Sequence, residues 1–512
     1  MRSETRSVPV LPTGRLGFMM AMAALMAMVL GPSVSAGQEE VSDETITRAI
    51  QSGWLDDFAV DPEHLTLEVR DGVVTLEGEV ENLLAKERAR RIAETIRGVR
   101  SVVNLIAVQP GRYRTDHEIR EDVEEALLAD PATYGFRILS EVEDGVVTLS
   151  GTVNSDAERR LAESLARSVR GVRAIDSRIV VDPPDMRGDR EIEREVQQML
   201  RWDVLVDDAL LAVHVLDGEV TLSGVVGSAA EKGRARLNAW VPGVKSVDAT
   251  YITVAEWLRD EDLRRDKYVH TPDHEIEEAV ERALLLDPRV LGSDVFVDSE
   301  QGVVTLEGTV PTLRARRGAE QVAWSTVGVV SVDNQLEVSP ADLHSDAHIG
   351  MRVQEAIERD ALLEEEDITV SVAAGIVTLQ GSVASYFERA QADLVASRVT
   401  GVMEVHNFLD VADEATPLLY DPFLQDFDPA AFPWYHFEPV PSRVSDEVIK
   451  ESIEERLFWN PYVESGLVRV TVEDGVATLR GTVTSMREKW AATASAFRGG
   501  AVRVNNLLVI PR

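Results

Sequence analysis

One eight-residue phrase recurs six times along the 512-residue chain, and no other feature restricts the possible folds as strongly. Its general form is Asp-Gly-x-Val-Thr-Leu-x-Gly, and the first copy spans residues 71–78. The first glycines of successive copies lie 73, 73, 84, 73 and 100 residues apart. They are Gly72, Gly145, Gly218, Gly302, Gly375 and Gly475. This period predicts six copies of one small domain, with insertions in two of the connections.

Each copy of the phrase lies at the centre of a predicted β-hairpin. Apolar residues alternate with polar ones before the turn, as in Leu65–Val69, and a Val-Thr-Leu-x-Gly-x-Val run follows it. Two alternating segments joined through Asp-Gly are typical of a hairpin. Gln301 and Ala374 replace the aspartate in two copies, and neither residue favours a positive φ. The sequence therefore favours a type I turn followed by a left-handed glycine over a strict two-residue turn.

A helix is predicted after each hairpin. Its N-cap positions all hold residues whose side chains can accept a backbone hydrogen bond. They are Asn82, Ser155, Ser228, Thr312, Ser385 and Ser485. Four of these helices have a glutamate three residues later, which predicts a capping box. These glutamates are Glu158, Glu231, Glu388 and Glu488. A glycine near the end of each helix, such as Gly98, suits the C-terminal cap.

A helix is also predicted before each hairpin, and a short apolar strand closes each unit. We expect the first helix to begin at an aspartate N-cap and to carry apolar residues with helical spacing on one side. The expected caps are Asp43, Asp116, Asp189, Asp273, Asp346 and Asp446. The predicted fold class is α+β: six small α-β-β-α-β domains in tandem. Each domain is a three-stranded mixed sheet covered on one face by two helices.

The period places the six repeats and the two connections along the chain. The repeats are expected at 41–110, 113–183, 186–256, 270–340, 343–413 and 443–512. Residues 257–269 form a charged linker, while residues 414–442 hold seven aromatic residues and six prolines. The second segment has three interpretations. It packs over repeats five and six, it docks a protein, glycan or membrane interface, or it is disordered.

The first 36 residues have the features of a secretory signal peptide. Arg2, Arg6 and Arg15 precede an apolar run at 16–30, and small residues end at Ala36. We expect cleavage near Ala36, a periplasmic location and no transmembrane segment in the mature chain. The alternative is an uncleaved anchor, for which the apolar run is short.

Charge and cysteine content narrow the function. Residues 1–36 carry three arginines and one glutamate, so their removal changes the formal charge from −37 to −39. Such a charge disfavours nucleic acid as a partner, because affinity for nucleic acid depends on neutralising phosphates. Cysteine is absent, which excludes disulfides, thiolate metal sites and a lipid-modified cysteine.

The order of elements and two motifs resemble the BON domain, which is named for osmotically induced periplasmic and nodulation proteins of bacteria. The motifs are the Asp-Gly-x-Val-Thr-Leu-x-Gly hairpin and a closing Gly-Val-x-x-Val-x-Asn run, present at 98–104 and 328–334. Repeats two, three and six depart from the closing motif at Ser177, Ala249 and Ala501. The resemblance implies work in the cell envelope without catalysis. Family members are linked to phospholipid binding, to chaperone activity under osmotic stress, and to assembly within secretion or channel proteins.

The sequence provides no set of residues typical of an active site. The recurrent threonine of the phrase lies in mid-strand without a recurring histidine or lysine, so its strand propensity explains it. His270 and His274, like His344 and His348, have a four-residue spacing but lie on both sides of a helix start. We therefore predict no catalytic residue, no metal ligand and no cofactor.

Candidate contacts for partners come from charge and aromatic content. The second helix of several repeats is basic, whereas the first helix is acidic, so the second could contact lipid headgroups or a neighbouring repeat. The candidate residues are Lys86, Arg88, Arg90, Arg91, Arg159, Arg160, Arg314, Arg316, Arg317, Phe432, Trp434, Tyr435 and Phe437.

The predicted function is that of a non-enzymatic periplasmic binding or scaffold protein, with an osmotic-stress holdase as one version. Its expected partners are envelope proteins or unfolded clients. The alternative is a peripheral phospholipid-binding protein that uses the basic second helices. Short linkers and the high charge favour an elongated array.

Overall fold

The computed structural model describes residues 41–55, 60, 62–130, 132–133, 137–183, 187–255, 267, 271–290, 293–340, 344–363, 367–411 and 444–511. The signal peptide and the aromatic connection predicted at 414–442 lie outside the described residues. Within the described ranges, no helix is both long and apolar enough to cross a membrane.

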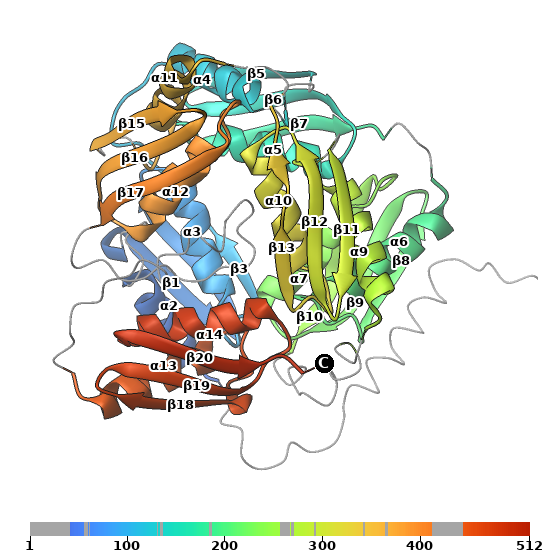
Figure 1. The fold of residues 1–512 in the computed structure, drawn as a ribbon, viewed down its shortest axis with the longest axis vertical. Coiled ribbons are helices and arrows are strands. Elements are labelled where there is room, and N and C mark those ends of the chain that lie inside the picture. The colour runs from blue at the N-terminus through green and yellow to red at the C-terminus, as the bar shows by residue number, and fades with distance from the viewer. Residues whose placement is uncertain are drawn as a thin grey trace, which may run out of the picture. The chain divides into compact units, whose positions relative to one another are not determined.

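The same five elements follow one another in all six repeats (Figure 1). The first helices are α2 (Asp43–Leu55), α4 (Asp116–Ala129), α6 (Asp189–Trp202), α9 (Asp273–Leu286), α11 (Asp346–Arg359) and α13 (Asp446–Trp459). The first strands are β1 (Leu65–Arg70), β5 (Arg137–Glu143), β8 (Leu211–Leu216), β11 (Asp294–Glu300), β15 (Asp367–Ala373) and β18 (Val468–Glu473). The second strands are β2 (Val73–Val80), β6 (Val146–Val153), β9 (Glu219–Val226), β12 (Val303–Val310), β16 (Ile376–Val383) and β19 (Val476–Thr482).

A second helix and a last strand complete each repeat. The second helices are α3 (Leu83–Glu94), α5 (Asp156–Arg167), α7 (Ala229–Asn238), α10 (Leu313–Trp324), α12 (Tyr386–Ser397) and α14 (Met486–Arg498). The last strands are β7 (Ala174–Val181), β10 (Ser246–Val254), β17 (Glu404–Val411) and β20 (Arg503–Val509). In repeats one and four the last strand is divided into β3 (Ser101–Asn104) with β4 (Ala107–Val108), and β13 (Ser331–Asn334) with β14 (Glu337–Val338).

The second strand is the centre of every sheet. It is antiparallel to the first strand and parallel to the last, so each sheet is mixed, as predicted. In repeat one the pairs Leu67↔Leu76 and Val74↔Val102 illustrate the register. Val74 and Leu76 are buried beneath the helices, whereas the alternate residues of the strand point to the other face. The six tandem α+β domains predicted from the sequence are therefore confirmed.

The hairpin turn differs from the prediction. Residues 71 and 72 both have positive φ, of 49° and 71°, and they lie between the paired residues Arg70 and Val73. All six turns share this geometry, including those that contain Gln301 (φ 54°) and Ala374 (φ 52°). The turn is thus a two-residue type I′ turn, and the predicted type I turn was wrong.

A carboxylate from the first helix explains why even alanine tolerates this turn. In repeat five, the two oxygens of Asp346 accept the backbone N–H groups of Ala374 and Gly375, each at 2.9 Å. The equivalent pair of bonds occurs in every repeat. These aspartates are the first helical residues rather than the N-caps that the sequence predicted. In repeats two and five the caps are Thr115 and Ser345.

The predicted N-caps of the second helices are confirmed. Each of the six side chains accepts a backbone hydrogen bond from the residue three positions later. Of the four predicted capping boxes, Ser385 with Glu388 forms both bonds. In the other three repeats the glutamate instead accepts the N–H of the residue before the cap, as Glu158 does from Asn154 at 2.8 Å.

The closing asparagine ties the last strand to the second helix. The side-chain amide of Asn407 donates to the backbone oxygen of Arg389 at 2.8 Å, and that of Asn104 donates to Lys86 at 3.0 Å. Repeats four and six have the same bond. Ser177 and Ala249, which stand at this position in repeats two and three, have no amide to donate.

The elongated array favoured by the sequence is not observed. Residues Ser42–Arg512 form one compact unit, in which repeats far apart along the chain contact one another. Trp324 of repeat four and Trp490 of repeat six, for example, pack edge to face with their ring centroids 4.9 Å apart. Net charge and short linkers favour an extended chain, but side chains buried between repeats hold them together, as in the cluster shared by repeats four and six.

Replacing Ala374 by glycine should stabilise the protein by about 1 kcal/mol, because a left-handed conformation strains any residue that has a Cβ. The same replacement at the neighbouring Ala373, an exposed strand residue, should destabilise it slightly. Thermal unfolding of the full chain by calorimetry measures both effects. Equal effects at the two positions would contradict the strained turn.

Candidate functional site

Two junctions between repeats are built in the same way, and a third keeps part of the pattern. The chain just after the first helix of one repeat lies against the chain just after the second helix of another. Between repeats three and four, the N–H of Val204 donates to the oxygen of Ser325, and the N–H of Val327 donates to that of Trp202, both at 2.9 Å. Between repeats five and two the equivalent bonds join Ala361 to Ser168 and Arg170 to Arg359.

The junction between repeats six and one keeps half of this pattern. The N–H of Arg97 donates to the oxygen of Trp459 at 3.1 Å, and the Arg97 guanidinium lies 4.5 Å from the centre of the Phe458 ring. Pro461 occupies the position of the second donor and has no N–H to offer.

Several cations predicted as partner contacts lie between repeats. Arg314 of repeat four forms an ion pair with Asp130 of repeat two, and both side chains are almost fully buried, at 3% and 2% exposure. Arg317 of repeat four binds Asp393 of repeat five at 2.5 Å. The second helix of repeat four therefore contacts two other repeats through arginine.

Aromatic rings receive two further cations of this set. The guanidinium of Arg88, which is 2% exposed, lies 5.1 Å from the centre of the Phe387 ring of repeat five. The guanidinium of Arg159 lies 5.4 Å from the centre of the Trp240 ring of repeat three. Stacking of guanidinium on an aromatic face is favourable where water is excluded.

The other predicted arginines, and Arg159 as well, have polar partners within their own repeat. Arg159 and Arg160 bind Asp156, Arg90 and Arg91 bind Glu87, and Arg316 donates to the oxygen of Asn334. Lys86 is half-buried, and its backbone oxygen accepts the Asn104 amide. The four predicted aromatic contacts lie outside the described residues: Phe432, Trp434, Tyr435 and Phe437.

Glu87 shows how strongly these cations act on an acid. Burial raises its pKa, but the hydrogen bond from Arg90 and the charges of Arg91, Arg90 and Arg167 together lower it to about 2. Arg167 belongs to repeat two, so the field on Glu87 crosses a boundary between repeats. The acid is therefore ionised throughout the physiological range.

An acid that is not among the predicted contacts recurs at these junctions, with asparagine in its place in repeat six. It lies fourteen residues after the aspartate that binds the hairpin turn, just beyond the first helix. In the repeats whose position is described, the residues are Asp130, Asp203, Asp287, Asp360 and Asn460. A comparison of the six repeats position by position would have found it. Its partners differ: Asp130 binds another repeat, whereas Asp203 binds Arg234 at 2.6 Å within its own repeat.

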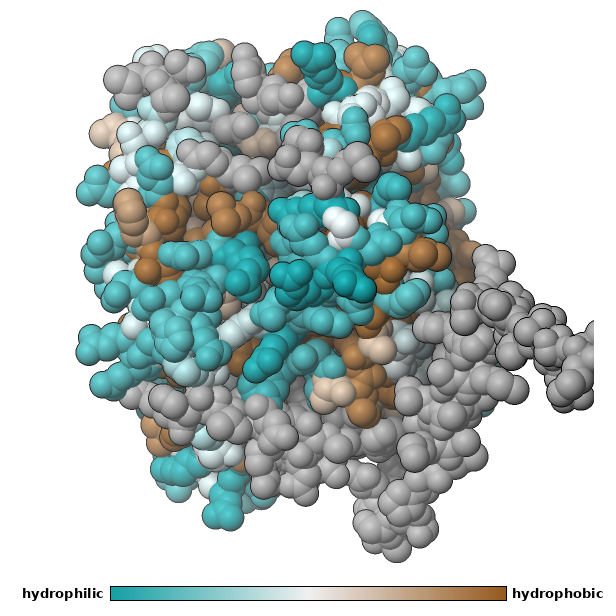
Figure 2. Space-filling model, turned by 90° about the vertical axis from the view of Figure 1, so that its right-hand side faces the viewer, coloured by the Kyte–Doolittle hydropathy of each residue, from teal (hydrophilic) through white to brown (hydrophobic). Residues whose placement is uncertain are grey.

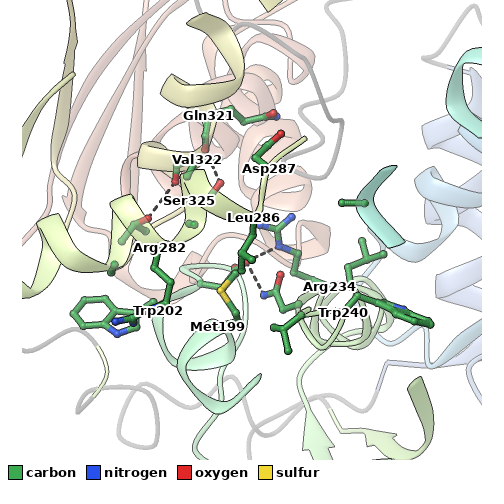
Figure 3. A pocket seen from close by; sticks show the side chains of 18 of the residues that line it. Met199, Trp202, Arg234, Trp240, Arg282, Leu286, Asp287, Gln321, Val322 and Ser325 are labelled. Atoms are coloured by element: carbon green, nitrogen blue, oxygen red, sulfur yellow. Dashed lines mark hydrogen bonds and ion pairs between the residues drawn. The ribbon is translucent and has the colours of Figure 1, made fainter. Parts of the chain in front are cut away.

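A cavity of about 180 Å³ lies beside the junction of repeats three and four, and its lining comes from repeats two, three, four and six. In Figure 3, Trp202 and Trp240 stand on opposite sides of the view, with Met199, Leu286 and Arg234 between them. The lining combines apolar side chains such as Met199 and Leu286 with arginine, so the cavity can accommodate a ligand of mixed character. Among the described residues, no group of three or more His, Cys, Asp or Glu side chains is placed to hold a metal ion.

These features define a tandem-repeat protein in which one small α-β-β-α-β module is used six times and the second helices lie largely between modules. The model of the BON domain family matches residues 42–110, 115–183, 188–256, 272–340, 345–413 and 445–512, and the chain belongs to this family.

The relatives are much shorter than this chain. Osmotically-inducible protein Y of Escherichia coli (strain K12) is 31% identical over 141 residues, which are 26% of this chain and 70% of the relative. Outer membrane lipoprotein DolP of Haemophilus influenzae is 31% identical over 138 residues, which are 26% of this chain and 71% of the relative. A solved C-terminal domain of CdsD, a structural protein of the type III secretion system of Chlamydia trachomatis, is 16% identical. That match covers 43% of this chain and 99% of the domain, and its TM-score of 0.12 is too low to support a structural comparison.

Asp360, at the junction of repeats five and two, makes stability depend on pH. It is buried and accepts hydrogen bonds from Gln391 and Leu362, and burial raises its pKa from 3.8 to about 6 despite these bonds and Arg398. The folded protein thus holds the proton more tightly than the unfolded chain does. The resulting stability is fully present below about pH 3.8 and is lost as the pH rises through about 6.

Asp360→Asn should therefore stabilise the protein near neutral pH, by up to about 3 kcal/mol, and have little effect at about pH 4. Asn460 stands at the same position in repeat six, so the amide fits this site. Asp287→Asn is the matched control and should destabilise near neutral pH, because it breaks the 2.5 Å pair with Arg289. Calorimetry of the full chain at both pH values distinguishes the two, and a destabilised Asp360→Asn near neutral pH would contradict the raised pKa.

Proposed function

We propose that this chain is a non-enzymatic binding and scaffold protein of the periplasm, acting as a holdase for unfolded clients under osmotic stress. The main support for the proposal is that one face of each sheet is not covered by helices. Two helices cover one face, and the residues of the other face point to solvent. The relatives named as osmotically inducible and as an outer membrane lipoprotein support an envelope setting.

Large apolar side chains lie on these uncovered faces. Leu139 of repeat two, Phe296 of repeat four and Phe408 of repeat five are 71%, 70% and 63% exposed. On the face of the molecule shown in Figure 2, apolar residues form separate patches between hydrophilic ones. Exposed apolar groups of this kind are the groups that unfolded segments would contact.

Multiplicity and charge suit a holdase. Each apolar patch is small and would bind weakly, but several patches on one chain bind one extended client far more tightly than a single patch can. The net charge of −37 keeps the protein soluble, and it would keep a complex with a bound client soluble as well.

Leu139→Thr, Phe296→Thr and Phe408→Thr combined should abolish most of the suppression of aggregation by the full chain. Light scattering of a thermally unfolding client measures this. The control combines Leu55→Gln, Leu128→Gln and Leu285→Gln, which remove apolar side chains of similar exposure from first helices. The proposal fails if the wild type does not suppress aggregation, or if the control loses as much activity as the sheet variant.

A second candidate, peripheral phospholipid binding, is favoured by the uncovered face of repeat six. Arg469, Arg480 and Arg503 are exposed on this face together with Leu507 and Val509. Cations flanked by apolar groups suit an anionic membrane surface. The second-helix arginines predicted as lipid contacts have partners in the folded unit. The repeats would therefore have to separate before the arginines at the junctions could reach headgroups.

Changing Arg469, Arg480 and Arg503 to glutamine should remove salt-sensitive co-sedimentation with vesicles that contain phosphatidylglycerol. Arg70, Arg137 and Arg178, which are exposed on the sheets of repeats one and two, provide a control with the same loss of charge. Absence of wild-type binding at low salt would exclude this candidate, because surface electrostatic attraction is strongest there.

A further inference from the structure

The cavity between repeats two, three, four and six is cationic, although the chain is strongly acidic. Its lining contains two acids, Asp203 and Asp287, and a larger number of guanidinium groups. The arginines are Arg160, Arg234, Arg282, Arg289 and Arg487. They come from four different repeats, so the folded unit as a whole creates the site.

The acids of the lining do not balance these arginines. Asp203 binds Arg234 at 2.6 Å, and Asp287 binds Arg289 at 2.5 Å. Two of the hydrogen bonds that Arg487 donates go to the Ser325 hydroxyl at 2.7 Å and to the Gln321 backbone oxygen at 3.2 Å.

Arg160 forms an ion pair at 2.7 Å with Asp156, which does not itself line the cavity. Burial lowers the pKa of Arg160, and the neighbouring charges of Arg234 and Arg159 lower it further, against the effect of Asp156. The guanidinium groups at this corner of the cavity therefore repel one another, and a bound anion would relieve that repulsion.

Arg282 is the most informative member of the set. It lies on α9, nine residues after the aspartate that binds the hairpin turn. The other repeats have neutral or acidic residues at this position: Ser52, Glu125, Gln198, Glu355 and Glu455. The acidic character of the first helix is thus reversed at one position, and that position faces the cavity.

The cavities at the two equivalent junctions are less cationic. At the junction of repeats five and two, a cavity of about 50 Å³ contains two arginines and two aspartates. At the junction of repeats six and one, a cavity of about 340 Å³ contains three arginines and one glutamate. The excess of arginine is therefore greatest beside repeats three and four, while Arg48 at the six–one junction provides a matched comparison.

We propose that the cavity lined by Arg234, Arg282 and Arg487 binds a small phosphate ester. Guanidinium groups match phosphate oxygens in pairs, and they bind them most strongly where water is displaced. Met199 and Leu286, which lie near the centre of the view in Figure 3, would contact the organic part of the ligand. A volume of about 180 Å³ limits the ligand to a small molecule or a lipid headgroup.

Ligand binding should stabilise the contacts among the four repeats. The ligand would contact residues that lie together in the folded unit and separate on unfolding, so it binds the native state preferentially. The unfolding temperature should accordingly rise with ligand concentration. This site is independent of the uncovered sheet faces, and the two proposals can fail separately.

Isothermal titration of the full chain with glycerol 3-phosphate and with inorganic phosphate, at constant ionic strength, tests the site. Both should bind saturably and raise the unfolding temperature, and glycerol 3-phosphate should bind more tightly than inorganic phosphate.

Arg282→Gln should weaken binding about tenfold or more, as expected for loss of one charge-assisted hydrogen bond. Arg48→Gln should leave it unchanged. Arg282→Lys keeps the positive charge but lacks the planar guanidinium, so its affinity for phosphate should lie between those of the wild type and Arg282→Gln. It provides a second variant if Arg282→Gln is unstable.

Absence of saturable binding to both phosphates overturns the proposal, and so does an equal effect of Arg48→Gln and Arg282→Gln. Vesicles that contain phosphatidylglycerol separate the two sources of phosphate. Vesicle binding that Arg282→Gln weakens assigns the site to a lipid headgroup, whereas vesicle binding unaffected by this change assigns it to a free phosphate ester.

Discussion

Two hydrogen bonds that the backbone of a turn donates to one carboxylate hold each module together. The first residue of helix one accepts both N–H groups of the hairpin turn, as Asp346 does from Ala374 and Gly375. These bonds fix the helix against the hairpin, and they let the turn adopt positive φ even with Gln301 or Ala374 in it. The turn sets the register of the first two strands, the second strand pairs with the last, and both helices then pack on one face of the sheet. The other face of each sheet remains uncovered because both helices of the module pack on the first face.

The second helices have two roles, and the second role makes the six modules one unit. Each covers its own sheet, and its outer side contacts other repeats, as the pair Arg314–Asp130 and the packing of Trp324 on Trp490 show. Both partners of the first pair are buried, so removal of Arg314 alone would leave the Asp130 carboxylate buried without this ion pair. Salt screens such buried pairs much less than it screens exposed ones. Contacts between repeats of this kind therefore depend little on the ionic strength of the surroundings.

The sequence predicts what is local and repeated. The hairpins and the caps of the second helices follow from residues within a few positions of one another. The parallel pair of each sheet joins residues 28 positions apart within one repeat, such as Val74 and Val102. Six copies reinforce each inference. The first aspartate of helix one was predicted as the N-cap, but it is the first residue of the helix. The two neighbouring positions favour the same side chains, so the sequence does not distinguish them. The pairing of Arg314 with Asp130 could not be predicted, since the two residues are 184 positions apart and no single repeat contains both. Arg282 was detectable in principle, as a basic residue at a position where five other repeats are neutral or acidic.

Differences among the repeats are more informative about function than their shared residues. The shared residues form the turn, the caps and the core, and the structure accounts for them without reference to any partner. The departures have no such explanation within a module: Pro461 removes a hydrogen bond from one junction, Asn460 replaces a carboxylate, and Arg282 adds a cation. Three junctions that share all or part of one backbone pattern thus differ in charge and volume. A protein that required only six identical modules would have no reason to concentrate arginine at one of them, so the junction of repeats three and four is where a ligand should be sought first.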